Sequence, residues 1–310
     1  MRFGITALST LAVVLAVTAP GAAAAPSADS GYRAHSQPHA NGTITTERYT
    51  GTAGSREFQV YRPRAHRPGQ PLMIWLHGAS KVRNGDPREL RRTSTLLTEA
   101  DRRGYSVVAA MQSLSVDPSG TWRVFDPANL IRGQGETSII AGIVRRSVRE
   151  LRADPSRVYV VGHSAGGAMT QNVVALYPEL FAGAATSASV PFAADPTGAL
   201  TRATRQGKPI PMFVVQADKD SLVPLFVSTL SIGAALNVNG IRGAHPAVSR
   251  LRATSSDRYP TVLERYGAGR REVVSATVIG ADHPTGPGGV TVNGPALDRK
   301  VITFLLSHRR

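Results

Sequence analysis

Residue types that can carry out nucleophilic chemistry follow strand-like apolar runs in this 310-residue chain. The first is Ser164, which stands in Gly-His-Ser-Ala-Gly between the run Val158–Val161 and a helical pattern. The flanking glycines permit a tight strand-to-helix turn in which a β-carbon would clash, and this turn projects the serine hydroxyl above the edge of a sheet. A glycine-rich loop is the ordinary explanation of such a pentapeptide, but its position between a strand and a helix favours a nucleophile.

A histidine must accompany this serine, because a hydroxyl is a weak nucleophile until a base takes its proton. Among the histidines after Ser164, His283 directly follows the end of a strand-like run, in Gly-Ala-Asp-His-Pro. The alternative, His245, lies in a loop-like stretch and is expected at the surface. We therefore predict His283 as the general base.

Three aspartates compete for the role of the acid that orients His283. Asp218 and Asp220 both follow the run that ends at Gln216. Asp220 is preferred because Asp-x-x-Val-Pro then leads into the next helix, the usual form after this strand. Asp218 is expected to accept hydrogen bonds from the backbone of the turn. Asp282 is a weaker alternative, because neighbouring side chains on an extended segment point apart.

The negative charge of a tetrahedral intermediate needs two backbone donors. We predict these as the N–H of Ala165, at the start of the helix after the serine, and the N–H of Ala79 in the loop Leu76–Ser80. His77 of the same loop is predicted to fix the shape of the loop, with contact to the substrate as the alternative. His163 is expected to pack beside the turn.

An alternation of short β-branched runs and longer helical patterns predicts the elements that position these residues. It is typical of an α/β fold, with a mostly parallel sheet and helices on both faces. The predicted strands are 58–61, 71–76, 106–111, 157–161, 183–187, 210–216 and 272–279, and the predicted helices are 87–103, 136–152, 165–177, 224–236 and 295–308. The segments 191–208 and 239–269 interrupt the alternation and are predicted as small cap or loop insertions over the active site.

The N-terminus has the pattern of a secretory signal peptide. Met1 and Arg2 precede an apolar run over 5–17, and an Ala-x-Ala pattern follows at 22–24. The run is shorter than the ~20 apolar residues of a membrane span. We predict a signal peptide over 1–24, a flexible lead-in over 25–42, a single catalytic domain over 43–310, and an extracellular location.

The composition excludes several kinds of site and partner. The chain has 36 Lys and Arg residues against 21 Asp and Glu, a formal net charge of +15, and no cysteine. Disulfides, thiolate zinc sites and cysteine nucleophiles are therefore excluded. The basic residues are scattered and carry no nucleic-acid-binding motif, so we expect a basic solvated surface and no nucleic-acid partner.

These motifs together resemble the esterase family of polyhydroxybutyrate depolymerases. The resemblance covers most of residues 71–306 and is carried by Leu76–Gly78, Trp122–Pro127, Arg132–Glu136, Asp154–Tyr159, the Ser164 turn and Gly280–His283. Relatives in this family include extracellular polyester depolymerases, feruloyl esterases and acetylxylan esterases. The resemblance implies an α/β-hydrolase with Ser164, Asp220 and His283 as its triad, and with neither a metal nor an organic cofactor.

The chain departs from this family at three places. Ala79 and Thr121 stand where members often have cysteines, so packing is expected to hold the two loops. One aromatic residue of the family's Trp-Asn-Trp-Phe-like stretch is missing, and Trp122 and Phe125 are predicted either to line an acyl-chain site or to pack in the core. Only 27 residues follow His283, so adsorption to a solid polyester is expected to use the catalytic domain's own surface.

We therefore expect a secreted serine esterase that cleaves carboxylic esters, in the first place polyhydroxyalkanoate polyesters. A feruloyl or acetylxylan esterase and a broad-specificity lipase or carboxylesterase are the alternatives, because the fold does not set the substrate. A non-catalytic exported polymer-binding protein is least favoured, since all triad residues are present. The expected partner is an ester substrate, and the expected state is a monomer without a membrane anchor after signal cleavage.

Overall fold

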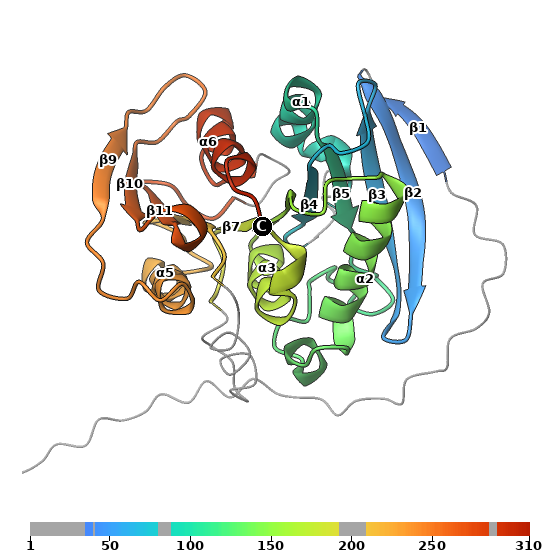
Figure 1. Ribbon diagram of the computed structural model, residues 1–310. Helices are drawn as coiled ribbons and strands as arrows, with labels where there is room; N and C mark the ends of the chain where they lie inside the picture. Colours follow the sequence, from blue (N-terminus) through green and yellow to red (C-terminus); the bar gives the residue numbers. More distant parts are fainter. Residues whose placement is uncertain (1–34, 40, 80–87, 192–208, 285–289) are drawn as a thin grey trace, which may run out of the picture. The chain divides into compact units, whose positions relative to one another are not determined.

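An 11-stranded sheet runs through the described residues of the computed structural model (Figure 1). The structure describes residues 35–39, 41–79, 88–191, 209–284 and 290–310. The strand order is β1-β2-β3-β5-β4-β6-β7-β8-β11-β10-β9. The strands are β1 His35–His39, β2 Gly42–Gly51, β3 Gly54–Pro63, β4 Leu72–Leu76, β5 Ser106–Ala110, β6 Val158–His163, β7 Gly183–Ser187, β8 Met212–Ala217, β9 Ala247–Leu251, β10 Thr261–Tyr266 and β11 Val273–Val278.

The central strands of this sheet are parallel, and antiparallel strands flank them at both edges. β5, β4, β6, β7, β8 and β11 pair in parallel in that spatial order. Every residue of β4, β5, β7 and β8 is buried, which explains why these strands carry few polar side chains. Because parallel strands end at the same edge of the sheet, the residues that follow them gather there.

Helices cover both faces of the sheet. They are α1 Ser94–Arg103, α2 Gly135–Glu150, α3 Ala165–Leu176, α5 Leu225–Val238 and α6 Pro295–Leu306, with 3-10 turns at η1 Leu90–Arg92, η2 Pro127–Leu130, η3 Pro178–Leu180 and η5 Gly269–Arg271. Figure 1 shows α1 and α6 on one face and α2, α3 and α5 on the other.

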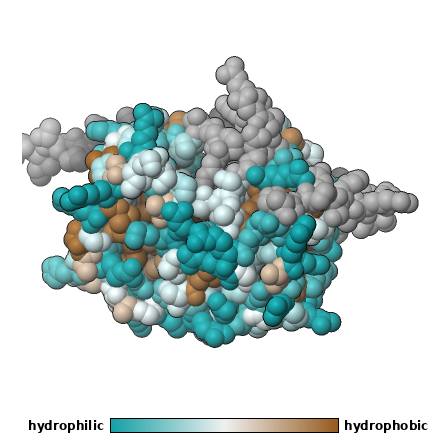
Figure 2. Space-filling model, turned by 90° about the horizontal axis from the view of Figure 1, so that it is seen from above, coloured by the Kyte–Doolittle hydropathy of each residue, from teal (hydrophilic) through white to brown (hydrophobic). Residues whose placement is uncertain are grey.

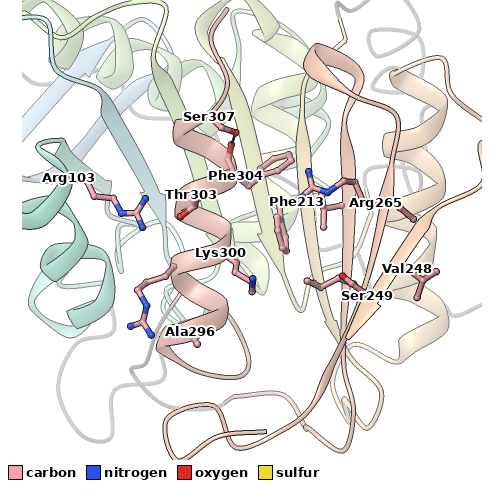
Figure 3. Close-up of a pocket in the computed structure, with 14 residues that line it drawn as sticks. Arg103, Phe213, Val248, Ser249, Arg265, Ala296, Lys300, Thr303, Phe304 and Ser307 are labelled. Carbon is pink, nitrogen blue, oxygen red and sulfur yellow. Dashed lines mark hydrogen bonds between the residues drawn. The ribbon is translucent and has the colours of Figure 1, made fainter. Parts of the chain in front are cut away.

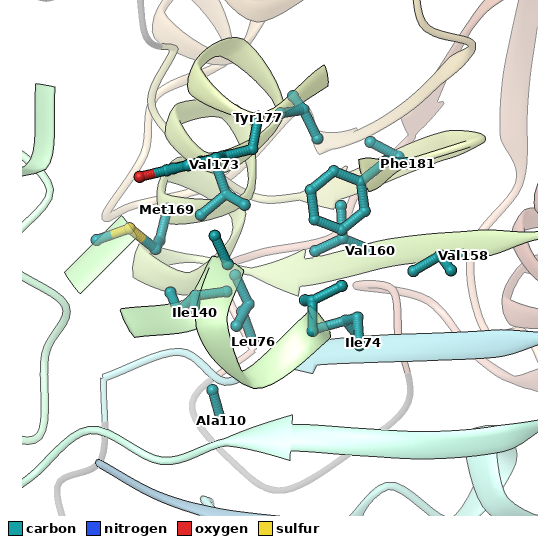
Figure 4. Packing of buried hydrophobic residues seen from close by; sticks show 14 of the residues in the cluster. Ile74, Leu76, Ala110, Ile140, Val158, Val160, Met169, Val173, Tyr177 and Phe181 are labelled. Carbon is teal, nitrogen blue, oxygen red and sulfur yellow. The ribbon is translucent and has the colours of Figure 1, made fainter. Parts of the chain in front are cut away.

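The core is split by the sheet into two apolar clusters, and alternate residues of β4 enter each. Ile74 packs in the cluster with α2 and α3, whereas Met73 packs in the cluster with α1 and α6. Figure 4 shows the first cluster, where Met169 and Val173 of α3 lie over the sheet residues. This alternation is the period of two that a strand buried on both faces requires.

The predicted α/β architecture is confirmed. Each of the seven predicted strands and five predicted helices corresponds to an element of the structure, with bounds that differ by up to several residues. The largest difference is at 87–103, where η1 and α1 form in place of one helix, and residues 80–87 lie outside the described part. The helix bounds agree best where glycine, proline or a strand end marks them.

Two predictions about the edges of the sheet are wrong. The predicted lead-in over 25–42 contains β1, which pairs with β2 from His35 to His39. The segment 239–269 is not a cap, because it supplies β9 and β10, which extend the sheet beyond β11. Ala247 to Arg250 of β9 are all exposed. Because no face of this edge strand is buried, its sequence lacks the alternation of apolar and polar residues that predicts a strand. Of the other predicted insertion, 191–208, all but the first residue lies outside the described residues.

Candidate active site

Ser164 lies on a sharp turn between β6 and α3. Its backbone has φ 53° and ψ −123°, a conformation that residues other than glycine rarely adopt. A β-carbon on Gly162 would clash with the backbone of Gly166, and one on Gly166 would clash with the carbonyl of Leu76. The Ser164 N–H donates to the Ser187 carbonyl at 2.8 Å, which holds the strained turn against the next strand.

A chain of hydrogen bonds joins Ser164 to His283 and Asp220. His283 Nε2 lies 3.1 Å from Ser164 Oγ, and His283 Nδ1 lies 2.9 Å from Asp220 Oδ2 and 3.0 Å from Oδ1. Since the carboxylate can only accept, Nδ1 carries a proton and Nε2 is free to accept the serine proton. The three residues follow β6, β8 and β11, whose carboxyl ends lie at one edge of the sheet.

The three candidate aspartates have different partners in the structure. Asp220 is 6% exposed and accepts the N–H groups of Leu222 and Val223 at 2.9 and 2.6 Å, in addition to facing His283. Asp218 Oδ1 accepts the N–H of Gly280 at 2.5 Å, which is the backbone role predicted for it. The rival base His245 is exposed. The structure thus places Asp220 and His283 at Ser164, and places Asp218 and His245 in other roles.

Asp282 joins the two loops that carry the acid and the base, a role that sequence reasoning missed. Its Oδ1 accepts from the N–H and hydroxyl of Ser221 at 2.7 and 2.8 Å, and from the N–H of His283 at 2.6 Å. The backbone N–H of Ser221 is the main cause of a lowered pKa of this carboxyl, followed by the N–H of His283. Since Ser221 follows Asp220 directly, these bonds fix the spacing between the acid and the base. A signal was available in the sequence, because Asp282 directly precedes the predicted base.

His163 packs beside the site in the neutral form. Its ring lies 5.3 Å from the ring of His283, centroid to centroid. Burial, and secondly the neighbouring His283, lower the pKa of His163 to about 4. This agrees with the packing role predicted for it.

The start of α3 and the loop after β4 meet next to Ser164. The N–H of Ala165 is the first of the helix and has no acceptor within it. A β-carbon on Gly78 would lie 3.2 Å from the β-carbon of Ser164, so this loop passes close to the nucleophile. Ala79 follows Gly78 and is exposed. The two predicted donors therefore lie on the two segments that border the hydroxyl, and their function as donors stays a prediction.

A buried polar network holds His77 and so determines the shape of this loop. His77 is 1% exposed, its Nε2 accepts the N–H of Gln112 at 3.0 Å, and its Nδ1 therefore donates to the Gly78 carbonyl at 2.6 Å. The side chain of Gln112 bonds Arg56 and Glu136, which form an ion pair at 2.9 Å. Sequence reasoning missed this network because its members are far apart in the chain. The alternative prediction that His77 contacts substrate is wrong, since its ring is enclosed.

Trp122 and Phe125 differ in exposure. Trp122 is 1% exposed, its Nε1 donates to the His77 carbonyl at 3.0 Å, and its ring lies 5.1 Å from the His77 ring. It supports the loop from behind, so its predicted place in an acyl-chain wall is wrong and its alternative core role holds. Phe125 is 49% exposed and stays a candidate for contact with substrate.

Neither a metal cluster nor a membrane span is found in the described residues. They contain no group of three or more His, Asp or Glu side chains that could hold a metal ion. None of their helices is long and apolar enough to cross a membrane.

The fold and the Ser164 turn define the class of this protein. A mostly parallel sheet with helices on both faces, in which a serine stands on a strand-to-helix turn at the carboxyl edge, is the α/β-hydrolase fold. A family model described as esterase PHB depolymerase matches residues 57–228, more than half of the chain. The chain belongs to this family.

Two curated relatives match parts of the chain. A poly(3-hydroxyalkanoate) depolymerase C of Paucimonas lemoignei is 33% identical over 139 residues, which are 45% of this chain and 32% of that protein. A feruloyl esterase B of Neurospora crassa is 49% identical over 118 residues, which are 37% of this chain and 38% of that protein. The matches thus span about a third of the length of each relative.

A solved structure supports the fold over most of the chain. An acetyl xylan esterase from Aspergillus awamori superposes with a TM-score of 0.61 at 18% identity, covering 84% of this chain and 98% of that one. At this identity the likeness concerns the fold. It agrees with the α/β-hydrolase architecture derived from the strand order.

Proposed function

We propose that this protein is a serine esterase that cleaves carboxylic esters through Ser164, His283 and Asp220. The observation that carries the proposal is the continuous hydrogen-bonded chain from Ser164 Oγ through His283 to the buried Asp220. In this chain His283 Nε2 takes the proton as Ser164 Oγ attacks the ester carbonyl, and Asp220 stabilises the resulting imidazolium. Membership of an esterase family supports the same reaction.

The tetrahedral intermediate is stabilised by N–H groups on the two segments that border Ser164. The N–H of Ala165 lies at the positive end of α3, and we assign the second donor to Ala79. Collapse of the intermediate releases the alcohol, which receives the proton from His283. Water activated by His283 then cleaves the acyl-enzyme and regenerates Ser164.

The substrate class we propose is an aliphatic polyester of the hydroxyalkanoate type. An apolar surface beside the site supports it: Leu222, Phe226 and Leu230 are 65%, 71% and 53% exposed. The chain carries no charged residue between Asp220 and Arg242, although its net charge is +15. Phe226 and Leu230 are four residues apart on α5 and so share one face. Such a surface suits contact with a water-insoluble polymer better than with a soluble sugar ester.

A feruloyl esterase is the second candidate. The 49% identity over 118 residues to the feruloyl esterase B of Neurospora crassa favours it. In that case the alcohol or acid part of the ester would be aromatic or carbohydrate, and the apolar face of α5 would have no role in activity.

The test compares soluble esters with a solid polyester. Wild type and Ser164→Ala are assayed on p-nitrophenyl esters of increasing chain length, on feruloyl and acetyl sugar esters, and on a polyhydroxyalkanoate emulsion. We expect Ser164→Ala to lose at least about 10⁴-fold in kcat on every active substrate. Full activity in that variant would refute the mechanism, and activity only on the sugar esters would refute the polyester assignment.

Variants of α5 test the adsorption surface. Phe226→Ser with Leu230→Ser should weaken adsorption to the polymer and slow its clearing, while hydrolysis of p-nitrophenyl acetate stays unchanged. Ile131→Ser is the matched control, because Ile131 is 43% exposed but lies at the end of η2 and not on α5. Equal loss of adsorption in the control would show that general apolar exposure, not α5, is responsible.

We also propose that residues 1–24 direct export and are then removed, and that the mature protein is an extracellular monomer. The mass of the protein recovered from the culture medium would test the cleavage after Ala24. Its mass in solution, measured by light scattering, would test the monomer. A retained N-terminus would refute the first statement, and a dimer the second.

A further inference from the structure

A groove runs along α6 on the face of the sheet that α1 and α6 cover. It has a volume of about 590 Å³ and is drawn in Figure 3. From Ala296 to Ser307 the lining follows α6 and its C-cap residue over eleven residue steps, or about 16 Å at the rise of an α-helix. β9, β10 and the second residues of β8 and β11 supply most of the other lining residues. The volume lies within the ordinary range for sites that hold a small molecule.

The charge around the groove has one sign. Arg103, Arg265, Arg299 and Lys300 line it, and none of its lining residues is acidic. Figure 3 shows Arg103 of α1 and Arg265 of β10 on opposite sides of α6. These two are paired with Glu99 and Glu272, which lie outside the lining.

The cations of α6 itself lack such partners. Arg299 and Lys300 form no ion pair with any described residue. Lys300 is exposed and Arg299 is half-buried. Their charges are therefore available to an anion that enters the groove.

The floor of the groove is apolar. Phe213 of β8 and Phe304 of α6 meet edge to face with ring centroids 5.4 Å apart. Leu263 and Val274 continue this floor, and Val248 is 58% exposed at the rim. Figure 2 shows the surface of the molecule from above, where apolar patches lie among hydrophilic side chains. An apolar floor below cations of one sign suits a ligand with an apolar chain and an anionic end.

The groove is separate from the site around Ser164. Phe213 and Val274 are the second residues of β8 and β11, whereas Asp220 and His283 follow the ends of these strands. Four strand steps from Phe213 to Ala217 alone span about 13 Å. None of the lining residues belongs to the hydrogen-bonded chain of Ser164.

We propose that this groove binds the free carboxylate of a single-chain acyl compound, such as a medium-chain fatty acid. The acyl chain lies along the apolar floor, and the carboxylate pairs with Arg299 and Lys300. An elongated, concave site favours one flexible chain over a flat lipid surface. A small anion would leave the floor uncovered. This site binds an acid without cleaving it, and so goes beyond the proposed esterase activity.

Calorimetric titration of the full chain with decanoate tests the proposal. We expect one decanoate to bind, acetate to bind at least about tenfold more weakly because it lacks the chain, and decyltrimethylammonium not to bind at this site. Added salt should weaken decanoate binding, because the groove is open to solvent. Equal binding of acetate and decanoate, or of the cationic and anionic amphiphiles, would overturn the proposal.

Variants locate the binding. Arg299→Gln with Lys300→Gln should weaken decanoate binding by about tenfold, the combined effect of two partly exposed charge pairs. Arg67→Gln with Arg149→Gln is the matched control, since it removes the same charge from exposed positions elsewhere. Unchanged affinity in the first pair, or an equal loss in the control pair, would refute the site.

A second pair of variants leaves α6 intact. Ser249 is exposed on β9 at the rim of the groove. Ser249→Glu adds a carboxylate there and should weaken decanoate binding, whereas Ser249→Gln adds a side chain of similar size without charge and should not. Equal effects of the two would show that bulk, and not charge, governs the site, and would contradict a carboxylate ligand. Ester hydrolysis by all these variants should equal that of wild type, so a failure of this proposal is distinguishable from a failure of the esterase proposal.

Discussion

Asp218 and Asp220 stand two residues apart at the end of β8, and their side chains have different partners. Asp220 is buried against His283 and receives two backbone N–H groups, whereas Asp218 bonds the N–H of Gly280. An anionic acceptor toward Nδ1 is what keeps the imidazole in the form that can take a proton at Nε2. The difference between the two carboxylates therefore lies in their orientation, which their order in the sequence alone does not reveal.

Substitution of each aspartate by asparagine should separate these roles. Asp220→Asn should lower kcat for a p-nitrophenyl ester by about 10³- to 10⁴-fold, because an amide can present a donor to Nδ1 and favour the wrong tautomer. Asp218→Asn keeps an oxygen acceptor for Gly280 N–H and should lose less than about tenfold. A larger loss of kcat in Asp218→Asn would reverse the assignment.

At the scale of elements, the loop after β4 is held by four residues from other parts of the chain, and Gln112 acts on His77 through its backbone N–H. Gln112 contacts His77 from one side, Trp122 contacts it from another, and the Arg56–Glu136 ion pair fixes Gln112 in turn. This ion pair is buried, with side chains 7% and 6% exposed, so removal of one partner would leave an uncompensated charge. The network therefore holds this loop by polar contacts and packing.

Variants of His77 test whether this loop positions an oxyanion donor. His77→Phe removes the hydrogen bonds of the ring to Gln112 and Gly78 and should lower kcat by about 10²-fold, with a smaller change in KM, because the donor acts on the transition state. His77→Asn keeps a donor near the position of Nδ1 and should recover part of the loss. A rise in KM with unchanged kcat would instead indicate a role in substrate binding, and no recovery by asparagine would indicate that the bond to Gly78 is not the important one.

The sequence predicts best those elements that are buried on both faces of the sheet. β4 and β7 are short and fully buried, and their predicted bounds agree with the structure to within one residue. β9 escapes prediction because its side chains are exposed, and β1 because it is a short edge strand that contains Pro38. Both edge strands pair with the next strand along the chain, so it is their short or exposed sequences that leave little pattern to detect.

The same distinction applies to the site. Ser164, Asp220 and His283 could be proposed from sequence because each follows a recognisable strand and the carboxyl ends of such strands gather at one edge. The contact of Gln112 with His77 could not, because the two residues are 35 positions apart, and the position of Asp282 beside the predicted base does not identify Ser221, 61 residues away, as its partner. Trp122 was ambiguous for a related reason, since an aromatic residue in a loop can face either the core or the solvent.

At the scale of the whole molecule, two buried ionisable groups make stability depend on pH in opposite directions. Asp298 is fully buried on α6, and burial raises its pKa to about 6 although the N–H groups of Val290 and Thr291 bond its carboxylate. The pKa of His163 is lowered to about 4 by burial. Both groups therefore titrate differently in the folded and unfolded chain between about pH 4 and pH 6.5.

Asp298→Asn should make the free energy of unfolding fall more steeply on acidification than it does in wild type. The folded pKa of Asp298 lies above its unfolded value of 3.8, so its protonation favours the fold on acidification, by up to about 3 kcal/mol. This contribution is complete below pH 3.8 and is lost as the pH rises through 6. In urea titrations at several pH values, Asp298→Asn should lose stability on acidification more than wild type does. Parallel curves would contradict the raised pKa, and Glu150→Gln, at an exposed position on α2, is the control.

His163→Asn should make the free energy of unfolding fall less steeply on acidification than it does in wild type. The pKa of His163 in the folded chain lies below its value of 6.5 in the unfolded chain, so the unfolded chain takes up the proton first. The free energy of unfolding therefore falls as the pH drops from 6.5 through 4, by up to about 3 kcal/mol. Without this group, the chain should lose less stability on acidification than wild type, and His163→Gln should behave alike if the effect is one of charge. The double variant should return to a slope close to that of wild type, since the two contributions are of similar size and opposite sign. A double variant that follows either single variant would show that the two sites are coupled.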